Sequence, residues 1–169
     1  QVRCLNEATD GMGKNPIKPY EDRSKHSPYL ESAEDDPELI LHIPFTEAVR
    51  LRSICIGGGP DELAPSKVHI FVNRDDVDFS IAEDLEPVQV VDLPGGGDME
   101  SRMDHALRPG KFHSVHSITL YVPESEGDGS TRIHYVGFKG TRTYAKRGIV
   151  EGAVYEALCP PGAHDITEA

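Results

Sequence analysis

The sequence predicts an all-β protein, an antiparallel β-sandwich of the jelly-roll type, with a long irregular N-terminal segment. Short stretches in which apolar and polar residues alternate recur along the 169-residue chain, and turn residues separate them. No stretch has the 3.6-residue apolar period of a long amphipathic helix. We expect three parts: an irregular segment over residues 1–37 that packs on the domain, the sandwich over 38–157, and a tail over 158–169.

Residues 38–59 are predicted to form the central hairpin of the sandwich. Apolar residues alternate before Thr46 and again after Ala48, and a few residues between two alternating runs are typical of a hairpin. Gly57–Gly59 and Pro60 are expected to end the second strand. The side chains expected on the buried face are Leu39, Leu41, Ile43 and Phe45 in the first strand, and Val49, Leu51, Ser53 and Cys55 in the second.

The remaining strands are predicted in order from the same alternation, and Asp78 is expected to cap a short helical turn that begins at Phe79. Apolar groups on both faces of 131–139 indicate that both sides of that strand are covered. Gly140–Gly148 is expected to be a loop. The predicted strands are Lys67–Asn73, Val88–Leu93, a short one around Met103–Leu107, Phe112–Pro123, Thr131–Lys139 and Ile149–Tyr155.

Composition restricts the partners and the compartment. The net charge of −12 disfavours nucleic acid and anionic membrane surfaces, because both would be repelled. No apolar run approaches the roughly 18 residues of a membrane span. The three cysteines form no C-x-x-C motif, which favours a reducing compartment, the cytosol or the nucleus. The chain begins at Gln1 without an initiator methionine, which indicates a piece of a longer protein.

No catalytic, cofactor or metal site is predicted. His113 and His116 are three residues apart, so on a strand they would point to opposite faces and could not bind one ion. The triple glycines at 57–59 and 95–97 lack the lysine and the following helix of a phosphate-binding loop. Cys55 is expected to be a small buried hydrophobe, whereas Cys4 and Cys159 are expected to be more exposed.

Two segments are candidate partner-binding sites. The expected loop at 140–148 gathers Arg142, Lys146 and Arg147 around Tyr144 in an otherwise acidic chain, which suits an acidic partner. The alternative is a solvated loop that balances nearby acids. The tail PPGAHDITEA contains His164 and Asp165 and suits a partner's groove, and simple disorder is its alternative.

Five segments together resemble one known family: CLNEA, NPIKPYEDR, ELILHIPFTEAVRLRSICIGG, TRIHYVGFKGTRTYAKRG and VYEALCPPGAHD. They are similar to the PITH domain, the proteasome-interacting module at the C-terminus of a thioredoxin-like protein, and more so to the stand-alone PITH domain-containing proteins. The resemblance implies a galactose-binding-like jelly roll and association with the 26S proteasome in the cytoplasm and nucleus. It implies no catalytic residues in this domain.

The leading hypothesis is therefore a monomeric, non-enzymatic protein-binding module without cofactors, an adaptor associated with the 26S proteasome. One alternative is a small-ligand or glycan-binding β-sandwich, suggested by the fold class alone. A second is a thiol-dependent redox protein that uses Cys4 or Cys159.

Overall fold

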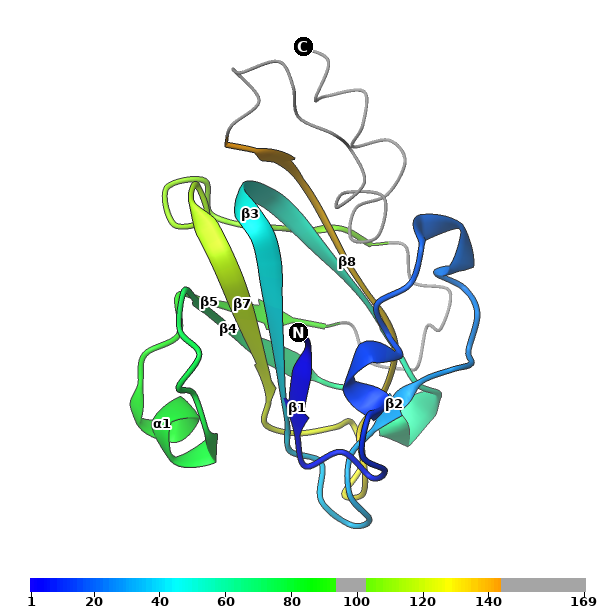
Figure 1. Ribbon diagram of the computed structural model, residues 1–169. Coiled ribbons are helices and arrows are strands. Elements are labelled where there is room, and N and C mark those ends of the chain that lie inside the picture. Colours follow the sequence, from blue (N-terminus) through cyan, green and yellow to red (C-terminus); the bar gives the residue numbers. More distant parts are fainter. Residues whose placement is uncertain (94–102, 144–169) are drawn as a thin grey trace.

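The computed structural model describes residues 1–93 and 103–143, which form an antiparallel β-sandwich (Figure 1). One six-residue helix, α1 (Phe79–Asp84), and three 3-10 turns accompany the strands. The strands are β1 (Arg3–Leu5), β2 (Leu30–Glu31), β3 (Leu39–Gly58), β4 (Lys67–Val72), β5 (Gln89–Asp92), β6 (His105–Ala106), β7 (Val115–Val122) and β8 (Arg132–Arg142). The 3-10 turns are η1 (Met12–Lys14), η2 (Tyr20–Asp22) and η3 (Asp61–Leu63).

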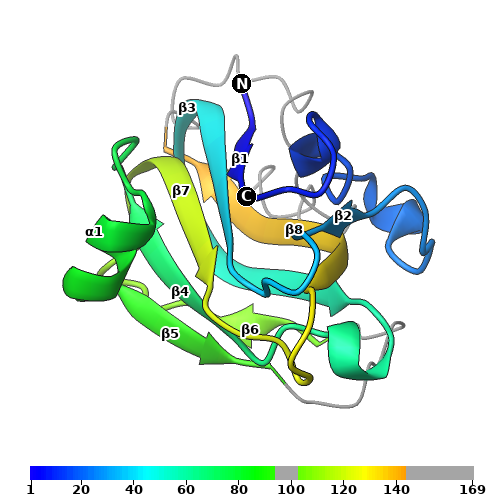
Figure 2. The same cartoon turned by 90° about the horizontal axis from the view of Figure 1, so that it is seen from below.

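Strand β3 belongs to both layers of the sandwich. Its first part pairs with β1 and β7, and β4 and β5 extend that layer. Its second part pairs with β8 and β6, and β2 adds to β8. Seen from below, β2 and β8 lie on one side of the molecule and β4 and β5 on the other (Figure 2).

The predicted hairpin at 38–59 is wrong, because Leu39–Gly58 is one strand of 20 residues. The pairing of β3 with β7 is irregular between Pro44 and Val49. Val49 pairs with both β7 and β8, and beyond Val49 the strand pairs with β8 and no longer with β7. The residues between the two runs are thus a bend at which the strand changes partner. After the bend, apolar and polar residues alternate again, and this second alternating run looks like a separate strand in the sequence.

The side chains expected to be buried in the second run are all buried, but only Val49 and Leu51 lie in the main core. The register with β8 shifts between Leu51 and Ser53, and such a shift moves the following side chains to the opposite face. Ile54 and Ile56 therefore enter the main core. Cys55 is buried, as expected, but it lies outside that core cluster.

Strand β3 ends at Gly58, within the stretch Gly57–Pro60 that was predicted to end it. Gly57 pairs with Tyr135 and Gly58 pairs with Ile133, so the strand includes both. A Cβ at Gly58 would lie 2.9 Å from Cδ of Pro65. Glycine is required at position 58 because Pro65 approaches the strand closely, and not because the backbone turns there.

The other predicted strands within the described residues are confirmed as β4, β5, β6, β7 and β8. The Asp78 cap is also confirmed, because Oδ1 of Asp78 accepts a hydrogen bond of 2.9 Å from the backbone N–H of Ile81. Strand β8 runs to Arg142, so the loop expected at 140–148 does not begin at Gly140. The predicted strand at 149–155 lies outside the described residues.

The N-terminal segment is less irregular than expected. Its strands β1 and β2 pair with β3 and β8, respectively. The stretch between them is also held, because the N–H of Val136 in β8 donates a 2.8 Å hydrogen bond to the carbonyl of Pro16. Val2 and Cys4 pack against the main core, so this segment closes part of the sandwich.

The main core fills the space between the two layers, and a smaller cluster lies on the outer face of the β3–β7–β4 layer. In the smaller cluster, Ile40, Phe71 and Tyr121 are covered by Val77 and by Ala82 of α1. Residues 133–138 of β8 are all buried, which confirms that both faces of this strand are covered. Across residues 1–93 and 103–143, the structure contains no helix with the length and apolar character of a membrane span.

Candidate functional site

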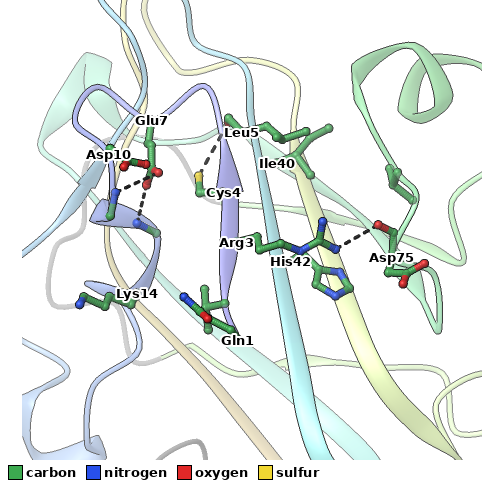
Figure 3. Close-up of a pocket in the computed structure, with 14 residues that line it drawn as sticks. Gln1, Arg3, Cys4, Leu5, Glu7, Asp10, Lys14, Ile40, His42 and Asp75 are labelled. Carbon is green, nitrogen blue, oxygen red and sulfur yellow. Dashed lines mark hydrogen bonds between the residues drawn. The ribbon is translucent and has the colours of Figure 1, made fainter.

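A cleft of about 650 Å³ lies around β1, on the outer face of the sandwich. Its walls come from β1, from the turn that contains η1, from the first part of β3 and from the loop after β4 (Figure 3). We call it the β1 cleft. Its lining residues are Gln1, Val2, Arg3, Cys4, Leu5, Glu7, Asp10, Gly11, Gly13, Lys14, Ile40, His42, Asp75 and Val77.

Arg3 and His42 lie side by side on the sheet, because they face each other in the register of β1 and β3. Nη2 of Arg3 donates a 3.0 Å hydrogen bond to the carbonyl of Asp75. Nδ1 of His42 lies 3.0 Å from Oγ1 of Thr119, whose hydroxyl donates to the carbonyl of Arg74 at 3.1 Å. The hydroxyl therefore accepts from Nδ1–H of His42, which leaves Nε2 as an acceptor.

The environment of His42 favours the neutral imidazole. The side chain is only 8% exposed. Burial is the main cause that lowers the pKa of His42, and the neighbouring Arg3 lowers it further. The cleft thus offers a neutral imidazole acceptor beside a guanidinium group, which is a pair suited to binding a polar group.

Glu7 holds the opposite wall of the cleft together. Its Oε1 accepts from the N–H of Gly11 at 3.1 Å, and its Oε2 accepts from the N–H of Gly13 at 2.7 Å. A Cβ at Gly13 would lie 2.7 Å from Cβ of Cys4, so this wall contacts β1 directly. The Glu7 carboxylate is therefore occupied in fixing the turn.

The thiols of the described residues are not activated. Burial, with a smaller contribution from Glu7, raises the pKa of Cys4 to about 12. Burial likewise raises the pKa of Cys55 to about 11. Both thiols stay protonated near neutral pH, and a thiol enzyme needs the thiolate. Cys159 lies outside the described residues.

The arrangement in the β1 cleft favours binding over catalysis. The carboxylate of Glu7 and the guanidinium of Arg3 are bonded to backbone groups, and neither is aimed at a nucleophile. Among the described residues, the lining contains no Phe, Tyr or Trp ring of the kind that stacks on a sugar. The described part of the chain contains no group of three or more His, Cys, Asp or Glu side chains that could hold a metal ion.

Arg142 does not lie in an exposed loop, contrary to the prediction. It is the last residue of β8 and is only 6% exposed. Its Nε lies 3.2 Å from Oε2 of Glu47, in the bend of β3. The next residue, Thr143, donates to the carbonyl of Ala48 from both its N–H and its hydroxyl. Arg142 thus joins the end of β8 to the bend.

The other predicted partner-binding residues lie outside the described residues: Tyr144, Lys146, Arg147, His164 and Asp165. His113 lies in the loop before β7, where its Nδ1 is 3.1 Å from the carbonyl of Gly110, and His116 is exposed on β7. The β1 cleft was not predicted. Arg3, Glu7 and His42 carry no motif, and they meet only because β1 pairs with β3.

Comparison with known proteins gives a consistent result. A family model described as the PITH domain matches residues 1–158. PITH domain-containing protein CG6153 of Drosophila melanogaster is 39% identical over 163 residues, which cover 96% of this chain and 75% of the relative. PITH domain-containing protein 1 of Homo sapiens is 31% identical over 166 residues, which cover 98% of this chain and 77% of the relative.

Solved structures of low sequence identity share the fold. A pectin-binding carbohydrate-binding module matches with a TM-score of 0.57 and 13% identity, over 82% of this chain and 88% of the module. A fucolectin from the serum of striped bass, Morone saxatilis, matches with a TM-score of 0.56 and 14% identity, over 84% of this chain and 47% of the lectin. The fold is therefore the galactose-binding-like β-sandwich that the family resemblance implied.

Proposed function

Because the chain belongs to the PITH domain family, we propose that it is a non-enzymatic protein-binding module, an adaptor that associates with the 26S proteasome in the cytoplasm and nucleus. The family resemblance supports the proteasome as the partner. The sandwich supports the adaptor role, since rigid β-sandwiches present binding residues at their ends.

The observation that carries the non-enzymatic part of the proposal is the make-up of the β1 cleft. Its charged side chains Arg3 and Glu7 hold the backbone, and His42 is bonded to a neighbouring strand. A general acid or base has to lie within hydrogen-bond reach of the reacting group, with a pKa near the working pH. The protonated thiol of Cys4 supplies no nucleophile either.

The partner contacts are proposed to come from residues that follow β8 in the sequence. Tyr144, Lys146 and Arg147 supply an aromatic ring and two cations, and His164 and Asp165 supply polar contacts from the tail. Arg142 acts indirectly in this proposal: its ion pair with Glu47 fixes the end of β8 from which these residues continue.

Affinity purification tests the proposal. The tagged 169-residue chain is incubated with cell extract at low salt, and the recovered proteasome subunits are quantified by mass spectrometry. We expect enrichment of the 26S proteasome, reduced by Lys146→Glu with Arg147→Glu. The matched control is Lys14→Glu with Lys25→Glu, which makes the same charge change at two exposed sites. Absence of proteasome subunits with the wild-type chain would refute the proposal.

A second candidate function is the binding of a small polar ligand in the β1 cleft. Its volume of about 650 Å³ lies within the usual range of ligand pockets. The side-by-side Arg3 and His42 would bind a group that accepts from the guanidinium and donates to the imidazole. A thermal-shift screen of metabolites and glycans tests it, and a hit that His42→Phe abolishes would support it.

A further inference from the structure

Two arginines point to solvent from β3 just after its bend. Arg50 and Arg52 are exposed. Val49, which precedes Arg50, and Leu51, which lies between the two arginines, are buried. This alternation places both guanidinium groups on the outer face of the sheet. Arg50 lies opposite Thr141 of β8 in the register.

A short turn adds two further cations beside these arginines. The N–H of Leu107 donates to the carbonyl of Arg52 at 2.8 Å, and the N–H of Leu51 donates to the carbonyl of Phe112 at 2.9 Å. Leu107 and Phe112 are buried in the main core, so both ends of the turn are fixed against β3. Arg108 and Lys111, between these ends, are exposed.

Together Arg50, Arg52, Arg108 and Lys111 form what we call the basic patch. It lies at the end of the sandwich where the bend of β3, the start of β7 and the end of β8 meet (Figure 1). None of its four cations has an ion-pair partner within residues 1–93 and 103–143.

Two described acids near the patch in the fold are already paired. Glu47 in the bend of β3 pairs with Arg142, and Asp104 just before β6 pairs with Lys139. The positive charge of the patch is therefore not balanced by these two carboxylates. In a chain of net charge −12, a cluster of four cations without an ion-pair partner among the described residues is a local exception.

We propose that the basic patch binds an acidic segment of the partner protein, with carboxylates that pair with Arg50, Arg52, Arg108 and Lys111. This inference rests on the proposed function as a protein-binding module and names the kind of partner surface. Guanidinium groups pair with carboxylates through charge-assisted hydrogen bonds. A polynucleotide is disfavoured, because the overall charge of −12 repels a long polyanion, whereas a short acidic segment contacts the patch alone.

Fluorescence anisotropy with a labelled decapeptide of alternating Glu and Ala tests the inference, and the same peptide with Gln in place of Glu is the probe control. We expect binding of the Glu peptide that weakens as salt rises, since exposed charges are screened. Arg108→Ser with Lys111→Ser should weaken it about fivefold, and adding Arg50→Ser and Arg52→Ser about thirtyfold, at roughly 0.5 kcal/mol per exposed pair.

The matched control is Lys25→Ser with Lys67→Ser, which removes two charges outside both the basic patch and the β1 cleft and should leave the affinity unchanged. Thermal unfolding of each variant shows that the domain still folds. Equal weakening by the control and the patch variants would overturn the inference, as would equal binding of the Gln peptide. Tighter binding of a single-stranded DNA decamer than of the Glu peptide would overturn the choice of partner.

The proteasome purification separates the two proposals. If the wild-type chain recovers proteasome and the four-residue patch variant recovers as much, the patch inference fails while the proposed function stands. If the wild-type chain binds the Glu peptide through the patch but recovers no proteasome, the proteasome proposal fails while the patch inference stands.

Discussion

The imidazole of His134 occupies the space into which a side chain at Gly57 would project. A Cβ at Gly57 would lie 2.7 Å from Nε2 of His134. Nδ1 of His134 is 2.8 Å from the carbonyl of Gly58, and the ring is only 1% exposed. His134 also lies where the β3–β8 register is irregular, between the pairs of Gly57 and Gly58. This contact therefore fixes how the ends of β3 and β8 fit together.

We expect Gly57→Ala to lower the free energy of unfolding by about 1–3 kcal/mol, because the added methyl group would displace a buried ring. Urea denaturation measures the change. Gly129→Ala is the control, since a Cβ there meets nothing within 4 Å, and its effect should stay within about 0.5 kcal/mol. Equal effects of the two substitutions would show that the Gly57–His134 contact is loose.

Arg142→Ala should destabilise the domain by about 1–3 kcal/mol, below the usual cost of breaking a fully buried pair because Glu47 is partly solvated. Arg50→Ala, at an exposed position of β3, should change the free energy of unfolding by less than about 0.5 kcal/mol. Because Arg142 pairs with Glu47, the double variant Glu47→Ala with Arg142→Ala should lose less free energy of unfolding than the sum of the two single variants. Strict additivity would contradict the pairing.

The two described cysteines should react slowly with thiol reagents. Burial raises the pKa of Cys4 to about 12 and of Cys55 to about 11, so almost no thiolate exists at pH 7.5. In a Cys159→Ser variant, we expect negligible labelling of the native domain and complete labelling after unfolding. A cysteine that reacts faster than a free thiol in the native domain would restore the thiol-dependent redox hypothesis.

The stability should fall as the pH drops below about 6.5, the usual pKa of histidine. Burial lowers the pKa of His42, His69 and His105 in the folded protein. In the acidic range the unfolded chain therefore binds more protons than the folded one, which reduces the free energy of unfolding. The contribution is fully present above the unfolded pKa and is lost below it.

Urea denaturation between pH 7.5 and pH 5 measures this dependence. We expect His42→Asn to flatten the curve, and His116→Asn, at an exposed position, serves as the control for the loss of a histidine. A curve for His42→Asn that stays parallel to that of the wild type would contradict the account of His42.

Local patterns in the sequence predicted the elements whose structure depends on local contacts. Strands β4 and β7 follow directly from their alternation, and the Asp78 cap involves a residue only three positions away. The resemblance of the five sequence segments added the galactose-binding-like fold, which the solved structures confirm.

Features that depend on distant contacts could not be predicted in the same way. The continuity of β3 is set by its change of partner from β7 to β8, and the burial of Cys55 outside the main core follows a shift of register. Arg142 is buried at the end of β8 and pairs there with Glu47, although the two are far apart in sequence. The β1 cleft likewise needs the pairing of Arg3 with His42.

Binding to purified 26S proteasome, followed by the comigration of fluorescently labelled chain on a native gel, tests the central claim most directly. We expect saturable comigration of the wild-type chain, weakened by Lys146→Glu with Arg147→Glu and retained by the matched control Lys14→Glu with Lys25→Glu. A folded wild-type chain that never comigrates with the proteasome at low salt would contradict the claim.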